Sequence, residues 1–360
     1  MTLSPEEVTA LISNPDLAAE KANLLYISEE DLCIERRKRG KGYQYLQDGE
    51  PVKPEVVERI NKLVIPPAWE KVMICPVDNG HLQVIGRDVK GRKQYIYHPD
   101  WTRIRNQTKF FKMSAFGKVL PKIRAQVDKD LDLRGMPMRK VLALVVRLME
   151  ETHIRIGNDT YARENKSYGL STLRSRHIQV SRGKMKFNFV GKRGIEHSVS
   201  VLDKKLIRLV NQCEEIPGWQ VFKYYDESGS KQSIDSGMVN RYIQEISGEL
   251  FSAKDFRTWS ATKIFFEHLR EKGYAEDEKE NKSNILSGFD TAAAALGNTR
   301  SVCRSYYVHP HVVEAYETGE IVPYFLKVNR KRTVKPHFSQ TEEVLLEMIR
   351  NFEINLEEQD

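Results

Sequence analysis

Hydrophobic residues recur with a strand period in the first hundred residues and with a helix period over most of the remaining chain. Runs rich in strand-forming residues at 72–76, 81–86 and 93–97 are separated by the turn sequences Asp-Asn-Gly and Lys-Gly-Arg. Residues 4–22 begin Ser-Pro-Glu-Glu, which supplies an N-cap, a proline at the first helical position and early acids, and so predict a helix. We therefore expect a small β-rich region with a few helices.

From Trp101 onward the pattern becomes mainly helical. Residues 102–130 predict a basic helix, and the apolar run 137–153 predicts a helix at the centre of a second core. Apolar residues alternate within 177–201 on either side of Gly-Lys-Arg-Gly, which predicts a hairpin with a glycine-flanked turn. Further helices are predicted at 203–213, 238–247, 260–272 and 288–296.

These elements predict an α+β protein with two domains, which agrees with a length of 360 residues. We place a β-rich N-terminal domain at residues 1–107 and a larger, mostly helical domain with a β-hairpin at 108–360. The polar run 275–283 is interpreted as a mobile loop. The last twenty residues hold seven acids and one Arg, and we expect an exposed helix and an acidic tail there.

Positive charge is concentrated at the domain boundary. The whole chain carries +7, whereas the stretch from Arg87 to Arg124 alone carries eleven Lys and Arg against two Asp. The remaining residues are therefore close to neutral. The glycine-punctuated segment 35–42 is also basic, and either a solvated loop or a loop beside a phosphate backbone would explain it. This distribution favours a polyanion as partner.

Several classes of protein are disfavoured by the sequence. No apolar run approaches the ~20 residues of a membrane span, and the first residues lack the basic and apolar regions of a signal peptide. The four cysteines are far apart and form no CxxC pair, so a disulfide framework or a structural zinc site is not expected. The GxxxxGK[ST] motif of nucleotide-driven motors does not occur in the sequence.

Five residues in separate motifs suggest one reaction. They are Arg155 in RIGN, Lys192 on the hairpin turn, Arg257 in KDFRTW, Asn298 in LGNT, and Tyr307, nine residues after Asn298. Each alone has an ordinary explanation as a surface or core residue. Together, two guanidinium groups and a hydrogen-bond donor can hold phosphodiester oxygens, a lysine can protonate the leaving oxygen, and a tyrosine can attack phosphorus without a metal.

These motifs and their spacing resemble the type IB DNA topoisomerases, in particular the compact bacterial and poxvirus-type enzymes. The resemblance covers roughly residues 70–320 and includes the segment 164–173, which is similar to the family's ENxxxGLxTL. The strand GRKQYIY resembles a family strand that enters the DNA major groove. The resemblance implies DNA contacts for two groups of residues, Gln94, Tyr95, Tyr97 and Arg105 in the first domain, and Tyr161, Thr172 and Lys254 in the second.

The implied activity is relaxation of supercoiled duplex DNA through a 3′-phosphotyrosyl intermediate, strand rotation and religation. Tyr307 would be the nucleophile and Lys192 the general acid, with no ATP, metal or other cofactor. The protein would act as a monomer, in the cytoplasm with the nucleoid. The neighbouring Tyr306 is a second possible nucleophile, and Lys254 could equally be an ordinary surface lysine.

Two other functions are compatible with these motifs. A tyrosine site-specific recombinase shares the same kind of catalytic set, although its usual HxxR motif is replaced here by the sequence ending in Arg257. A non-catalytic DNA-binding protein of the same fold is the other alternative. Relaxation of any supercoiled plasmid without metal would distinguish the topoisomerase from both.

Overall fold

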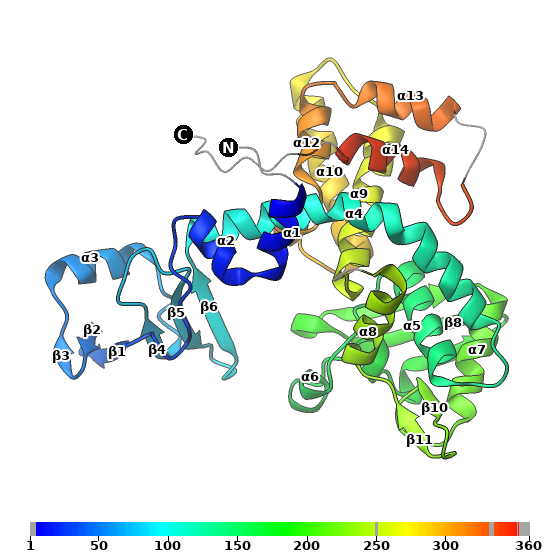
Figure 1. The fold of residues 1–360 in the computed structure, drawn as a ribbon, viewed down its shortest axis with the longest axis horizontal. Helices are drawn as coiled ribbons and strands as arrows, with labels where there is room; N and C mark the ends of the chain where they lie inside the picture. The colour runs from blue at the N-terminus through cyan, green and yellow to red at the C-terminus, as the bar shows by residue number, and fades with distance from the viewer. Residues whose placement is uncertain (1–4, 249–250, 331–334, 351, 353–360) are drawn as a thin grey trace. The chain divides into compact units, whose positions relative to one another are not determined.

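The computed structural model describes residues 5–248, 251–330, 335–350 and 352, and the chain divides into two compact units. One unit comprises the residues up to Phe111, and the other runs from Lys112 to Phe352. The boundary falls within a long helix, α4 (Pro99–Leu131). Figure 1 shows a strand-rich N-terminal unit and a mostly helical second unit, so the α+β class is confirmed. In the described part of the chain, no helix has the length and apolar character needed to cross a membrane.

The first unit is built on one antiparallel sheet of six strands in the order β3-β2-β1-β4-β5-β6. The strands predicted at 72–76, 81–86 and 93–97 are confirmed and form one half of this sheet. The full set of strands is β1 (Ile34–Arg39), β2 (Gly42–Gln47), β3 (Glu50–Pro51), β4 (Glu70–Ile74), β5 (Leu82–Arg87) and β6 (Lys93–Tyr97). Helix α3 (Pro54–Lys62) contributes Ile60 to the core that β1, β4 and β5 share.

Two predictions for the N-terminal unit were wrong in detail. The expected single helix at 4–22 is two helices, α1 (Pro5–Ser13) and α2 (Pro15–Lys21), because Asn14 caps the second and Pro15 begins it. The basic segment 35–42 is not a loop but part of the β1–β2 hairpin. Arg36 is buried there and donates to the carbonyl oxygen of Trp69 at 2.6 Å, so a guanidinium that looked solvated holds two segments together.

Helices form most of the second unit, and α5 (Met138–Thr152) lies at its centre, with ten of its fifteen residues buried. The other helices are α6 (Asp159–Glu164), α7 (Lys204–Glu215), α8 (Ser236–Ser247), α9 (Ala253–Lys272), α10 (Glu278–Leu296), α11 (Arg300–Tyr306), α12 (Pro310–Glu317), α13 (Val322–Arg330) and α14 (Gln340–Ile349). All the helices predicted from 203 to 296 are present, and α9 and α10 begin earlier than expected. Because α10 begins at Glu278, most of the loop predicted at 275–283 is helix.

Two small sheets complete the second unit. The predicted hairpin is confirmed as β8 (Lys184–Val190) and β9 (Glu196–Val201), and β7 (Ile178–Ser181) pairs with β8. Short strands β10 (Lys223–Tyr225) and β11 (Lys231–Ser233) form a separate pair that the sequence pattern did not predict. Residues 192–194 turn between β8 and β9, with Arg193 and Gly194 at positive φ.

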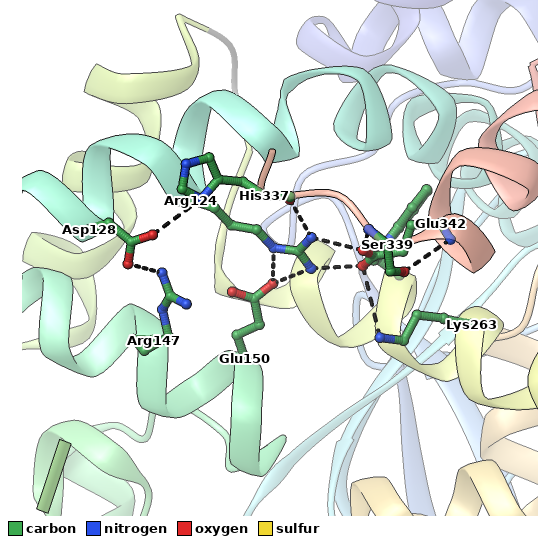
Figure 2. Close-up of polar contacts among 9 residues, drawn as sticks. Arg124, Asp128, Arg147, Glu150, Lys263, His337, Ser339 and Glu342 are labelled. Carbon is green, nitrogen blue, oxygen red and sulfur yellow. Dashed lines mark hydrogen bonds and ion pairs between the residues drawn. The ribbon is translucent and has the colours of Figure 1, made fainter. Parts of the chain in front are cut away.

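The expected exposed C-terminal helix is instead packed into the second unit, which corrects the prediction for that segment. Seven residues of α14 are buried, including Glu342, whose side chain is only 2% exposed. Arg124 of α4 donates two hydrogen bonds to the Glu342 carboxylate, at 2.8 and 2.7 Å, and one to Glu150 of α5 at 2.6 Å (Figure 2). Glu342, an acid of the helix that was expected to be exposed, thus forms an ion pair with Arg124 inside the second unit. The acidic residues from 353 onward lie outside the described residues.

Candidate active site

The segment after α5 places Arg155 at the centre of the second unit. Helix α5 ends at Thr152, and its C-cap residue His153 adopts the left-handed conformation. The backbone of the 164–173 segment braces the chain after this cap, because the Leu170 N–H donates to the Arg155 carbonyl at 2.9 Å. Gly169 packs so closely against the Arg155 carbonyl and the Gly157 backbone that no side-chain carbon would fit there. The carbonyl group of Arg155 is therefore held by the neighbouring residues Gly169 and Leu170.

The Arg155 guanidinium points to the loop after α10. It donates to the side-chain oxygen of Asn298, and both its terminal nitrogens lie 3.4 Å from the Gly297 carbonyl oxygen. The amide nitrogen of Asn298 faces the sulfur of Cys303 at 3.9 Å. Because the Asn298 oxygen accepts from Arg155 and one amide hydrogen is directed to Cys303, the second amide hydrogen remains as a donor.

Arg257 lies on α9 and joins the two segments that carry Arg155 and Asn298. Its side chain is buried, and its terminal nitrogens donate to the His153 carbonyl and, at 2.8 Å, to the Leu296 carbonyl. Its Nε is buried and has no hydrogen-bond partner among the described residues. A buried donor without a partner is costly, so an anionic ligand at this position would be favoured.

Tyr307 follows α11 and faces the two arginines. Its ring centroid lies 5.7 Å from the Arg257 guanidinium carbon. Burial alone would raise the pKa of this phenol, but the charges of Arg257, Arg155 and Lys254 and a hydrogen bond with Arg257 together lower the pKa below its ordinary value. The phenolate is thus stabilised where a nucleophile would need it.

The neighbouring Tyr306 differs from Tyr307 in its surroundings. Its side chain is 45% exposed, whereas Tyr307 is half-buried against the arginines. The spacing argument from Asn298 and the geometry therefore point to the same residue.

Lys192 lies on the turn between β8 and β9 and is the residue of the set most accessible to solvent. Partial desolvation and the positive charges of Arg155, Arg193 and Lys254 lower the pKa of its ammonium group. A lowered pKa makes a lysine a better proton donor near neutral pH. Lys254 is exposed on the first turn of α9, and it contributes to the low pKa of both Lys192 and Tyr307.

The residues expected to contact DNA in the first unit lie on two faces of β6 and on α4. Tyr95 and Tyr97 are each 41% exposed on the same face of the strand, with ring centroids 5.9 Å apart. Gln94 alternates to the other face and donates to Asp88 at 3.1 Å. Arg105 is exposed on α4, where its guanidinium lies 5.6 Å from the ring centroid of Trp101.

The two remaining candidates in the second unit are unlike each other. Tyr161 on α6 is 55% exposed and free to meet a ligand. Thr172 is buried, and its hydroxyl accepts from Gly169 N–H at 3.0 Å and lies 3.1 Å from the Gly169 carbonyl oxygen. The Thr172 hydroxyl therefore already has local partners in a tight turn.

Sequence reasoning missed residues that hold the site together. The ring of His197 stacks on Phe189 of the hairpin and packs against Gly191 and Gly297, so it connects the Lys192 turn to the Asn298 loop. The strand pattern showed His197 only as one member of an alternation. Its proximity to two glycines distant in sequence could not be read from that pattern.

Comparisons with known proteins cover most of the chain. The family model "Eukaryotic DNA topoisomerase I, catalytic core" matches residues 98–324, and the model "Bacterial DNA topoisomerase IB, N-terminal domain" matches residues 42–88. DNA topoisomerase 1B of Acanthamoeba polyphaga mimivirus is 33% identical over 284 residues, which cover 77% of this chain and 84% of the relative. DNA topoisomerase 1B of vaccinia virus (strain Copenhagen) is 23% identical over 248 residues, 68% of this chain and 74% of the relative.

Proposed function

The chain belongs to the type IB DNA topoisomerases, which relax DNA by transient cleavage and religation, and from this premise we propose that Tyr307 is its nucleophile. The observation that carries the proposal is the position of the Tyr307 phenol beside Arg155 and Arg257, whose charges lower its pKa. Among the described residues, the buried Nε of Arg257 is a donor that still lacks a partner. A phosphate oxygen at this point would satisfy it.

In the proposed reaction the phenolate oxygen of Tyr307 attacks a backbone phosphorus, and the bond from phosphorus to the 5′-oxygen breaks. The DNA 3′ end becomes a phosphotyrosyl ester, and Lys192 gives its proton to the departing 5′-oxygen. Arg155, Arg257 and an amide hydrogen of Asn298 stabilise the charge on the non-bridging oxygens. Religation reverses these steps after the strand has rotated, and the ester conserves the bond energy, so the cycle uses no ATP. The guanidinium groups supply the positive charge that a metal would otherwise supply.

We further propose that the substrate is duplex DNA and that Tyr95, Tyr97 and Arg105 contribute contacts from the first unit. The support is their exposure and the concentration of positive charge from residue 87 to residue 124. Tyr161 and Lys254 are the exposed candidates in the second unit. Gln94 and Thr172 would need to exchange their present partners for DNA, since both already make hydrogen bonds within the protein. The enzyme would act as a monomer on DNA in the cytoplasm.

Plasmid relaxation tests the proposal directly. With EDTA present and ATP absent, the wild-type protein should relax supercoiled plasmid, and denaturing gels should show protein attached to a 3′ DNA end. Tyr307→Phe should lose both relaxation and covalent attachment while DNA binding is retained, because only the attacking oxygen is removed. Tyr306→Phe is the matched control and should keep both activities. If Tyr306→Phe instead abolished the covalent complex, the assignment of the nucleophile would be wrong.

A further inference from the structure

A buried hydroxyl on α9 contacts the main chain of the proposed nucleophile. Thr262 has no exposed surface and lies five residues after Arg257 on the same helix. Its Oγ1 is 3.1 Å from the carbonyl oxygen of Tyr307 and accepts a hydrogen bond from the His309 N–H, also at 3.1 Å. It also lies 3.1 Å from the carbonyl oxygen of Thr258, one turn earlier in α9.

The hydroxyl of Thr262 provides a hydrogen-bond donor for the carbonyl of Tyr307, which lies between two helices. Helix α11 ends at Tyr306 and α12 begins at Pro310, so the carbonyl of Tyr307 has no continuing helix to accept a hydrogen bond from. The Thr262 hydroxyl has one hydrogen, which the carbonyls of Tyr307 and Thr258 share at 3.1 Å each, and its lone pairs accept from the His309 N–H at the same time. One side chain of α9 therefore fixes both ends of the short link between α11 and α12.

The same helix carries Arg257, and this gives the contact a consequence for catalysis. Arg257 gathers the segments of Arg155 and Asn298 through the carbonyls of His153 and Leu296. Thr262 adds the third segment by holding the main chain of Tyr307, whose ring faces the Arg257 guanidinium at 5.7 Å. Because both contacts come from one rigid helix, the distance from the phenol to the guanidinium is set by α9.

We infer that Thr262 is a positioning residue of the cleavage reaction, which holds the Tyr307 phenol in line with the phosphate that Arg257 binds. The inference rests on the proposed role of Tyr307 and goes beyond it, since Thr262 does not touch the phenol. Misplacing a reacting group by about 1 Å can cost about 100-fold in rate. Losing the hydroxyl should therefore slow attack on phosphorus without weakening DNA binding.

A matched control lies one turn away on α9. Thr258 is also buried, and its hydroxyl lies 3.1 Å from a carbonyl of its own helix, that of Lys254. Thr258→Val and Thr262→Val thus remove the same group from the same buried helix, and only Thr262→Val removes a contact with the Tyr307 segment. A purely structural role would give both variants the same phenotype.

The experiment measures single-turnover cleavage of a nicked suicide duplex, the dissociation constant for the uncleaved duplex, and the urea midpoint. We expect Thr262→Val to cleave at least about tenfold more slowly than wild type, with a dissociation constant within about twofold. Thr262→Ser keeps the hydroxyl and should recover most of the rate. Thr258→Val should cleave at the wild-type rate even if its urea midpoint falls. If Thr262→Val does not fold, Thr262→Ala carries the same expectation.

Two outcomes would overturn the inference. One is a cleavage rate for Thr262→Val equal to that of Thr258→Val, and the other is a failure of Thr262→Ser to restore the rate. The proposed function has a separate test, which it fails if Tyr307→Phe still forms a covalent complex with DNA. An inactive Tyr307→Phe together with a fully active Thr262→Val would reject only the role of Thr262.

Discussion

Replacing Glu342 by Gln should destabilise the second unit far more than its place in an acidic C-terminal segment suggests. The carboxylate accepts two hydrogen bonds from Arg124, one from the Trp259 indole at 3.1 Å and one from the Ser339 backbone at 2.9 Å (Figure 2). Lys263 lies 3.9 Å away. Glutamine has nearly the same shape but removes the negative charge, so Arg124, whose side chain is 14% exposed, would keep only Glu150 as an acidic partner, and Lys263 would lose its acidic neighbour.

The magnitude follows from the acidity of the group. Burial would raise the pKa of Glu342, but the hydrogen bonds and charge of Arg124, the charge of Lys263 and the hydrogen bond from Ser339 together lower it from 4.5 to about 2. A shift of that size corresponds to about 3 kcal/mol of folding stability at pH 7. The carboxylate is charged in the folded state and stabilises it above the unfolded pKa. This contribution is lost as pH falls toward the folded pKa, and should be about halved by pH 3.

The assay is urea unfolding followed by circular dichroism at a helix wavelength, which reports mainly on the helical second unit. At pH 7, Glu342→Gln should lower the free energy of unfolding by about 3 kcal/mol, and the difference from wild type should shrink as pH is lowered. The control is Glu347→Gln on the same helix, which breaks an exposed pair with Lys327 and should cost less than about 1 kcal/mol. Equal losses in the two variants, or a difference for Glu342→Gln that does not change with pH, would refute the reasoning.

Two further predictions concern the reaction and the binding of DNA. The single-turnover cleavage rate should fall as pH rises through the lowered pKa of Lys192, and Arg155→Gln should move this alkaline limb to higher pH because it removes a cation that disfavours the ammonium; an unmoved limb would argue against Lys192 as the acid. Glu29 forms an ion pair with Lys93 on β6, the strand expected to contact DNA, and so neutralises the charge of that lysine. Glu29→Gln should therefore tighten duplex binding about twofold to fivefold in a fluorescence anisotropy titration. Glu30→Gln makes the same change of charge next door, and an equal gain in that variant would show that only net charge matters.

Elements with a strong local pattern could be predicted from the sequence. The strand at 81–86 is a continuous buried run, the strand at 93–97 alternates exposed and half-buried residues, and ten residues of the apolar helix near 137–153 are buried, so the local pattern identifies each of them. The hairpin at 35–42 could not be predicted in this way. Arg36 is buried because the carbonyls of residues thirty positions away accept its hydrogens, and no local pattern records those acceptors.

Some residues of the candidate site could likewise be predicted from local sequence, and others could not. Side chains that would act on DNA stand in short ordered motifs, so Arg155, Arg257 and Tyr307 could be named from their spacing. The residues that set their distances act through backbone carbonyls, as Thr262 does, or through close packing against glycine, as His197 does. In the sequence, a threonine or histidine with such a role cannot be distinguished from any other buried threonine or strand histidine, because the partner that gives it the role lies on another element.

The candidate site also contains contacts of Arg155 that the sequence does not reveal. Arg155 would bind a phosphate oxygen, yet here its guanidinium donates to Asn298 and lies against the Gly297 carbonyl. A guanidinium has five N–H groups, so these contacts leave donors for a phosphate and do not block it. They also fix the Asn298 side chain with its oxygen toward Arg155 and its amide nitrogen toward Cys303. A phosphate that accepts the second amide hydrogen of Asn298 would therefore leave the contact between Arg155 and Asn298 intact.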